Sequence, residues 1–249
     1  MSDLAADDAS AWVAGADGYR EGWIVVLFQP TTGTTRCCTV EDVDALITLS
    51  EASAVLGIDM VIGLPDRAEP GGRACDRAAR QLLGHPRGSS VFSPPAYDVL
   101  GAETYDEAVR RNRAGGPDAP GLSKQTFHLL PKMQAVAQRV TPALQERVRE
   151  VHPELAFYAM NDDTPVSDSK HTEAGRSART HLLAAHGFPA VEATVSDASG
   201  SAVGPDDVLD AHAACWTAHR MAQGTAERCP PRNAEAPRND RGLRMEIWR

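Results

Sequence analysis

Residues 12–28 read WVAGADGYREGWIVVLF, and this stretch decides the fold. It predicts two strands, at residues 11–17 and 22–29, that are joined through Gly18 and Gly22 as a hairpin. Asp17 ends the first strand directly before the glycine turn, where its carboxylate can reach solvent and a metal ion. A plain Asp-Gly turn is the alternative role of this residue, because aspartate is common in turns.

The segments after the hairpin alternate between strand and helix patterns. A threonine-rich strand is predicted at 34–40, and a helix at 41–52, whose acidic first residues favour the helix dipole. Residues 54–62 form a continuous apolar run, which is typical of a central strand covered on both faces. Beyond Pro65 the pattern changes to helices separated by Gly and Pro, at 73–83, 105–113 and 124–149, the last with Pro131 and Pro142 as breaks.

The C-terminal part continues the alternation. We expect a strand at 150–160 with Pro153 at its start, edge or bulge, because proline cannot donate a ladder hydrogen bond. The other predicted elements are a helix at 172–185, a short strand at 190–195, an alanine-rich helix that Pro205 opens, and a final strand at 242–248. Together they predict an α/β fold with a mixed sheet, in a single domain of residues 1–249 with a helical insertion at about 65–149.

The composition limits the classes of partner. The chain of 249 residues has a formal charge of -9, which argues against a broad basic surface, so any contact with nucleic acid should be local. The five cysteines are odd in number and form no Cys-x-x-Cys pair, which predicts reduced thiols in a cytoplasmic protein. We find no signal segment and no apolar run of membrane-spanning length, so we expect no membrane contact.

Five acidic residues are candidates for a functional site. Besides Asp17, Asp59 lies inside the apolar run, and Asp210 lies on the alanine-rich helix three residues after Asp207, hence on the same helix face. Glu154 follows a proline and could be a further ligand or could orient a water. Buried carboxylates are unfavourable unless they are paired, and a divalent cation is the simplest partner for several that converge.

Each acid also has a structural role open to it. Asp59 could be hydrogen-bonded to backbone or arginine, and Asp207 could stabilise the dipole in the first turn of its helix, from which Asp210 gains less. Glu154 could be a solvated residue of an edge strand. If three or four of the acids converge, they form an oxygen-rich site that prefers Mg²⁺ or Mn²⁺, and two such ions can promote phosphodiester hydrolysis.

The motifs around these acids resemble a known family. They are GADGYREGW at 15–23, IDMVIGLP at 58–65, RACDRAAR at 73–80, VFSPP at 91–95, HPELAF at 152–157 and DVLDA at 207–211. This set is similar to a bacterial and archaeal family of predicted RNase H-like nucleases (domain-of-unknown-function family 429). The order of the acids also resembles the RuvC-type Holliday-junction resolvases of the RNase H superfamily.

The resemblance implies an RNase H-like fold, with a mixed five-stranded sheet, flanking helices and a helical insertion after the fourth strand. It also implies that Asp17, Asp59 and Asp210 are metal ligands, with Asp207 as a fourth, and that Glu154 is a motif residue of catalytic interest. The resolvases usually carry glutamate where this chain has Asp59, so a shorter side chain stands at that position.

Basic residues near these motifs could contact substrate phosphates. Arg73, Arg77 and Arg80 are spaced at i, i+4 and i+7 and so share one face of a predicted helix. The alternative is a solvated face that pairs with Asp76 or other acids. Lys170 is a weaker candidate of the same kind.

The sequence thus predicts a Mg²⁺- or Mn²⁺-dependent nuclease that hydrolyses DNA or RNA by a two-metal carboxylate mechanism. Two alternatives stay open. One is a non-catalytic RNase H-like binding module in which the acids brace the fold, and the other is a phosphotransferase of actin-like fold, for which no further glycine-rich phosphate loop is found. No Gly-x-Ser-x-Gly elbow or Walker-type loop occurs. The choice between DNA and RNA and the oligomeric state are left open.

Overall fold

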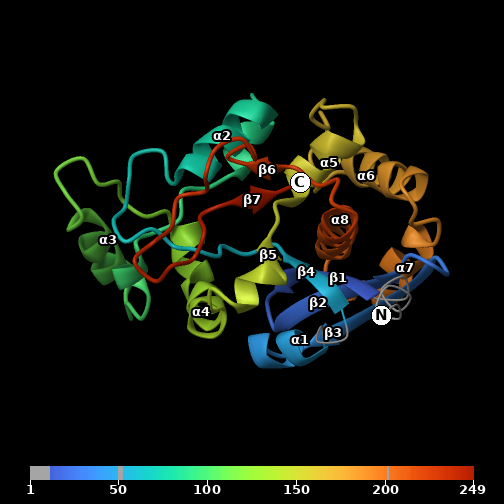
Figure 1. The fold of residues 1–249 in the computed structure, drawn as a ribbon, viewed down its shortest axis with the longest axis horizontal. Helices are drawn as coiled ribbons and strands as arrows, with labels where there is room; N and C mark the ends of the chain where they lie inside the picture. Colours follow the sequence, from blue (N-terminus) through green and yellow to red (C-terminus); the bar gives the residue numbers. More distant parts are fainter. Residues whose placement is uncertain (1–11, 50–52, 201) are drawn as a thin grey trace, which may run out of the picture.

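The structure of the protein is a computed structural model, which describes residues 12–49, 53–200 and 202–249. Its central feature is a mixed sheet of five strands in the order β3-β2-β1-β4-β5 (Figure 1). The strands are β1 (Trp12–Tyr19), β2 (Gly22–Gln29), β3 (Thr34–Val40), β4 (Ser53–Ile58) and β5 (Val148–Glu150). Strands β1 to β3 form an antiparallel meander, while β4 runs parallel to β1 and β5 parallel to β4. The predicted α/β class with a mixed five-stranded sheet is therefore confirmed.

The two faces of β1 follow from the two-residue period of a strand. Ala14 and Ala16 belong to the apolar cluster on one face, whereas Val13 belongs to the cluster on the other. By the same alternation, Gly15 and Asp17 share the face of Val13. Asp17 therefore lies two residues before the end of β1, on the face whose side chains are directed at a helix layer.

Helices cover both faces of the sheet (Figure 1). On the face of Ala14 lie α1 (Val43–Leu49) and α4 (Lys124–Arg139), which share one apolar cluster with β1, β2 and β4. On the opposite face lies α8 (Pro205–Ala222), which is flanked by α5 (Pro153–Met160), α6 (Glu173–Ala185) and α7 (Val191–Ala198). The alanine-rich face of α8 thus packs directly on the sheet.

Two glycines permit this close approach of α8. A Cβ atom at Gly15 of β1 would lie 2.5 Å from the Cα of Cys215, and closer still to the backbone of Cys215 and Ala211. A Cβ atom at Gly57 of β4 would lie 2.6 Å from the carbonyl oxygen of Ala214. These distances are well inside van der Waals contact, so the helix backbone rests on the strand backbones without intervening side chains.

A helical insertion separates β4 from β5, as predicted, and extends to the left in Figure 1. Besides α4 it contains α2 (Ala74–Leu83), η3 (Arg87–Ser90), η4 (Tyr97–Val99), α3 (Tyr105–Arg113) and η5 (Leu144–Glu146). Pro131 was expected to break its helix, yet α4 runs through it to Arg139. Pro142, the second expected break, lies beyond the end of α4.

Four strand predictions were wrong or too long. The strand expected at 54–62 is β4, which ends at Ile58, so Asp59 follows the strand. Residue 150 is the last residue of β5, and residues 153–160 form α5. Pro153 stands at the first helical position, where a backbone N–H would have no partner within the helix, so proline is tolerated there. Residues 190–195 belong to helix α7 instead of a strand. The strand expected at 242–248 is reduced to β7 (Ile247–Trp248), which pairs with β6 (Arg228–Cys229).

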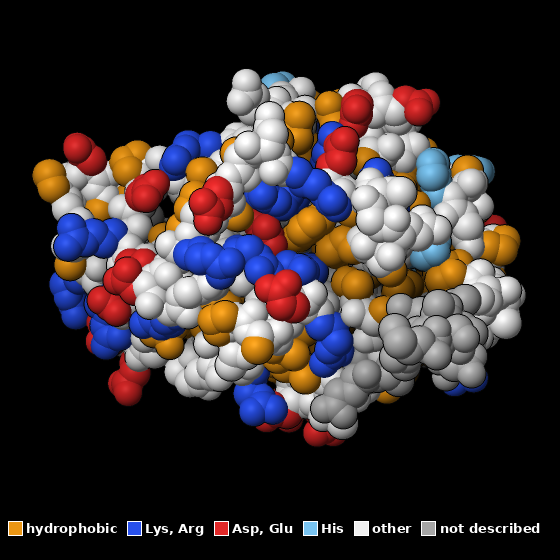
Figure 2. Space-filling view, viewed as in Figure 1, with side chains coloured by type: hydrophobic (Ala, Val, Ile, Leu, Met, Phe, Trp, Pro, Cys, Tyr) orange, Lys and Arg blue, Asp and Glu red, His pale blue; other side chains and the backbone are white. Residues whose placement is uncertain are grey.

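Arginine side chains hold the C-terminal segment. Figure 2 shows Lys and Arg side chains gathered over the middle of the viewed face, near β6 and β7. In this segment, Arg149, Arg228 and Arg244 all approach the buried Glu246, with nitrogen to oxygen distances of 3.1, 3.5 and 3.0 Å. These ion pairs hold the segment together with an apolar cluster in which Cys229 and Ile247 pack against α2.

All five cysteines are free thiols, and Cys37 and Cys38 pack into the clusters on opposite faces of the sheet, as expected for neighbours in a strand. Within the described ranges, none of the helices has the length and apolar character needed to cross a bilayer.

Candidate metal site

Three of the predicted acids converge at one end of the sheet. Asp17, Asp59 and Asp210 each offer one carboxylate oxygen, and these oxygens all lie within 4.8 Å of one another. Asp17 and Asp210 are buried, with exposed fractions of 8% and 2%, and Asp59 is half-buried. The residues are far apart in the sequence, so the fold itself assembles the group.

The parallel pair β1 and β4 places the first two acids. Asp17 is on the face of β1 that meets α8, and Asp59 directly follows β4, where its N–H donates to the carbonyl of Ala16 at 2.9 Å. This bond extends the parallel ladder by one residue, so both carboxylates leave the sheet at the carboxyl ends of adjacent strands. Ligand sites in α/β sheets form at such strand ends.

Helix α8 brings the third acid and separates it from its neighbour. Asp210 lies in the second turn of the helix, beside Ala211, whose backbone packs on Gly15. Asp207 lies in the first turn, and its Oδ2 accepts the N–H of Gly204 at 2.9 Å. Asp207 therefore caps the helix from the rim of the cavity and is not one of the three converging acids, which agrees with the structural role considered for it.

The pKa values of the three acids reflect their crowding. Burial, followed by the charges of Asp59 and Asp210, raises the pKa of Asp17 well above its ordinary value. Burial also raises the pKa of Asp59 to about 6 and that of Asp210 to about 6, although Lys170 opposes the shift at both. Closely spaced buried carboxylates resist ionisation unless a cation joins them, so this group has the electrostatics of a cation site.

One cation of the protein lies against the group. The Nζ of Lys170 donates to Asp210 Oδ2 at 2.5 Å. The carboxylates of Asp210 and Asp17 in turn help to raise the pKa of Lys170 against the effect of burial. The other oxygen of Asp210, Oδ1, is buried and has no hydrogen-bond partner in the part of the chain that the structure describes. A buried carboxylate oxygen without a donor is unfavourable unless an ion coordinates it.

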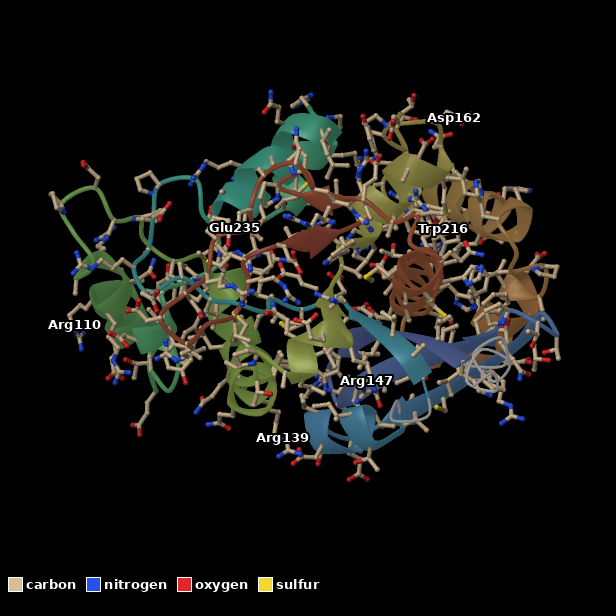
Figure 3. The ribbon with its side chains drawn as sticks, in the orientation of Figure 1. Arg110, Arg139, Arg147, Asp162, Trp216 and Glu235 are labelled. Atoms are coloured by element: carbon tan, nitrogen blue, oxygen red, sulfur yellow. The ribbon has the colours of Figure 1, made fainter. Side chains whose placement is uncertain are left out.

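Glu154 lies next to the group, and an arginine of α6 binds its carboxylate. It stands in the first turn of α5, and its Oε1 accepts from Arg179 Nη2 of α6 at 2.6 Å. Arg179 is fully buried and Glu154 is 7% exposed, so this is an internal ion pair and not the solvated edge-strand residue considered from the sequence. Figure 3 places Asp162 in the connection between α5 and α6 and Trp216 on the side of α8 near α6.

The three arginines predicted to contact phosphate are engaged with the protein. Arg73, 2% exposed, pairs with Asp76 at 2.7 Å and with Glu150 at 2.5 Å, and it donates to the carbonyl of Ile62 at 2.8 Å. It therefore supports the loop that follows Asp59. Arg77 pairs with Glu69, and Arg80 donates to the carbonyl of Val91 at 2.8 Å. Pairing with Asp76 was the alternative considered from the sequence, although the pair is buried and not solvated.

A cavity of about 430 Å³ opens in front of the acids. Its walls come from the ends of β1, β4 and β5, from α8, from η3 and from the segment before α6; they include Lys170, Arg87, Ser90 and His152. The Nε2 of His152 lies 3.3 Å from the carbonyl of Ser90, and burial lowers the pKa of this imidazole. The cavity thus combines a carboxylate group with a lysine, an arginine and a neutral histidine.

Two interactions of this region were not found from the sequence. The pair Glu154 with Arg179 joins residues 25 positions apart on different helices, and Lys170 with Asp210 joins residues 40 positions apart. No spacing rule connects such residues before the fold is known.

A family model matches residues 15–235, which is most of the chain and includes all three converging acids. Its description is "Protein of unknown function (DUF429)". The chain belongs to the DUF429 family. Comparisons with curated proteins and with solved structures give no match. Membership of DUF429 therefore fixes the family of this chain, while its chemistry has to be argued from the site.

Proposed function

We propose that this DUF429 protein is a divalent-cation-dependent phosphodiesterase that cleaves nucleic acid. The observation that carries the proposal is the group of Asp17, Asp59 and Asp210, whose oxygens lie within 4.8 Å of one another at the base of a cavity. The resemblance to predicted RNase H-like nucleases names the same three residues as metal ligands. Sequence likeness and spatial convergence therefore point to one site.

The residues present fit Mg²⁺ or Mn²⁺. The donor set consists of carboxylate oxygens, which these hard cations prefer, and it contains none of the thiolate or imidazole ligands typical of zinc sites. Oδ1 of Asp210 is buried, and none of the described residues donates a hydrogen bond to it. This oxygen is therefore open to a cation. When bound, such an ion lowers the pKa of a water for attack on phosphorus and neutralises charge on the leaving oxygen.

The remaining groups of the cavity have roles around the scissile phosphate. Lys170 adds a positive charge beside Asp210, and Arg87 adds a second one at the cavity wall. The Arg179 guanidinium pairs with Glu154 Oε1 and fixes this side chain in place, so that Oε2, which has no hydrogen-bond partner among the described residues, can accept a hydrogen bond from a water or a sugar hydroxyl. The lowered pKa of His152 keeps its ring neutral near pH 7, where it can accept or donate a proton.

The size and charge of the site favour local contact with a polymer. A cavity of about 430 Å³ is within the range that holds one small-molecule group, roughly 300–1,000 Å³. It can take up the phosphate and sugar of one nucleotide, while the rest of the strand stays outside. Since the chain has a formal charge of -9, we expect few phosphate contacts and a correspondingly shallow dependence of affinity on salt.

The test is a cleavage assay with Mg²⁺ or Mn²⁺ on branched, duplex and single-stranded DNA and RNA, with ATP in a parallel reaction. Asp17→Asn removes one of the converging charges, and Asp118→Asn makes the same chemical change at an exposed loop position. We expect metal-dependent cleavage by the native protein and by Asp118→Asn, and none by Asp17→Asn. Cleavage that survives Asp17→Asn would contradict the proposal. ATP turnover would favour the phosphotransferase, and metal binding without any turnover would favour the binding module.

A further inference from the structure

Lys170 places its ammonium against the acid group. Its ammonium lies 2.5 Å from Asp210 Oδ2 and is close enough to Asp17 and Asp59 to interact with both charges. The three acids draw their oxygens from two strand ends and one helix, and the lysine approaches from a fourth direction, the segment before α6. The fold has thus supplied one positive charge of its own to this site.

The backbone around Lys170 is fixed by several contacts. The carbonyl of Ser169 accepts from the N–H of Thr172 at 2.9 Å and from its hydroxyl at 2.8 Å, and Arg179 donates to the carbonyl of Asp168 at 3.0 Å. On the other side of the segment, Arg87 donates to the carbonyl of Ser167 at 3.1 Å. Lys170 is therefore presented to Asp210 by a braced turn and is not a surface lysine that has folded back by chance.

The residue type supports the same conclusion. Of the 25 basic residues in the chain, only those at positions 124, 132 and 170 are lysines, so arginine is the usual cation of this protein. An ammonium is a compact point charge, whereas the guanidinium of arginine is a wide planar fork. Between carboxylates whose oxygens lie within 4.8 Å of one another, the compact cation resembles a metal ion in its demands on space.

The charges of the site balance with a single divalent ion. The three converging carboxylates carry a formal -3 when ionised, and the Lys170 ammonium reduces this to -2, which one divalent cation neutralises. Glu154 does not enter the balance, because Arg179 already neutralises it, and Asp207 lies at the half-exposed rim. A second divalent ion beside the lysine would leave a net charge of about +2 in a largely buried site, whereas two divalent ions without the ammonium would leave about +1, so the ammonium disfavours the second ion.

We propose that the acid group binds one divalent cation, and that the Lys170 ammonium takes the place of the second ion of a two-metal site. The inference rests on the metal site of the proposed function and replaces the two-metal arrangement expected from the sequence. In the bound state Lys170 stays beside Asp210 and provides the second positive charge that faces the substrate phosphate.

The number of bound ions tests this inference apart from any cleavage. Mn²⁺ is titrated into the native protein, into Lys170→Met and into Lys124→Met, and the ions bound per chain are counted by equilibrium dialysis or from the free Mn²⁺ signal in electron paramagnetic resonance. Lys124 is exposed at the start of α4, so Lys124→Met makes the same change of charge away from Asp210. We expect one ion in the native protein and in Lys124→Met, and two in Lys170→Met, where the released position gains a free Asp210 oxygen.

Each other result has a defined meaning. Two ions in the native protein would overturn the inference and leave the proposed function intact, and this measurement does not require any variant to fold. A single ion in folded Lys170→Met, at whatever affinity, would also overturn it, because the lysine would then not be filling a metal position. No bound ion in the native protein would instead remove the proposed function itself.

Discussion

Gly15→Ala tests the direct contact between β1 and α8 that positions the acids. The Cβ atom built at Gly15 lies 2.5 Å from the Cα of Cys215 and nearer to two backbone atoms of the helix. Since carbon atoms pack at about 3.5–4.0 Å, α8 has to move away from β1 by roughly 1 Å. The obstacle is backbone on both sides, so no side-chain rotation can relieve it.

Two effects of this displacement are expected. Forced overpacking of a core costs about 1–3 kcal/mol, which should lower the urea midpoint of unfolding. The displaced segment of α8 includes Asp210, and metal sites tolerate changes in ligand distance of only about 0.2 Å, so Mn²⁺ affinity should fall about tenfold or more. Both quantities can be measured on the same preparation, by urea titration and by Mn²⁺ titration.

Gly200→Ala is the matched control. A Cβ atom at Gly200 meets no atom within 4 Å among the described residues, so the substitution should change the unfolding free energy by less than about 0.5 kcal/mol. If Gly15→Ala leaves both the urea midpoint and the Mn²⁺ affinity as they are in Gly200→Ala, then the close packing of α8 on β1 does not hold the acids in register.

Three further outcomes are expected. Arg179→Met should lower the unfolding free energy by about 3–5 kcal/mol, because it leaves Glu154 buried without a cation, and adding Glu154→Gln should restore part of the loss in urea titration. Burial lowers the pKa of His212 to about 4, so below its ordinary value of 6.5 the unfolded chain binds a proton that the folded chain does not. Stability should therefore fall by about 3 kcal/mol, relative to His212→Gln, as the pH drops from 6.5 towards 4; parallel curves would contradict this. Protons compete with a metal for Asp59 and Asp210, whose pKa values are about 6, so Mn²⁺ affinity should rise between about pH 5 and pH 7, and a flat profile would exclude these ligands.

The sheet could be predicted from the sequence because its strands carry strong local signals. The hairpin of β1 and β2 has apolar runs on both sides of a glycine-flanked turn, and β4 is a continuous apolar run. The strand prediction for 150–160 failed because the eight mainly apolar residues of α5 fit a buried strand as well as a buried helix. The proline and glutamate that open α5 were the available signal, since proline at the first helical position and an acid in the first turn both favour a helix.

In the candidate site, the acids could be proposed from the sequence, whereas the roles of the basic residues could not. Asp17, Asp59 and Asp210 could be proposed because each interrupts an apolar or alanine-rich segment, and the fold brings all three together. The basic residues were harder to place, because a charge on a helix surface looks the same in sequence whether it pairs with the protein or faces a ligand. Arg73 is engaged by Asp76 and Glu150, whereas Lys170, the weaker candidate from the sequence, lies against Asp210.

The position of α8 in the chain has a consequence for synthesis on the ribosome. Asp210 is made 193 residues after Asp17, and at about 5–20 residues per second roughly 10–40 s pass between the two. During this interval α8 does not yet cover the face of β1 that carries Gly15, and of the other two acids only Asp59 can already lie near Asp17. A nascent chain therefore cannot complete the acid group, and any chemistry of the site begins only when α8 has emerged and docked.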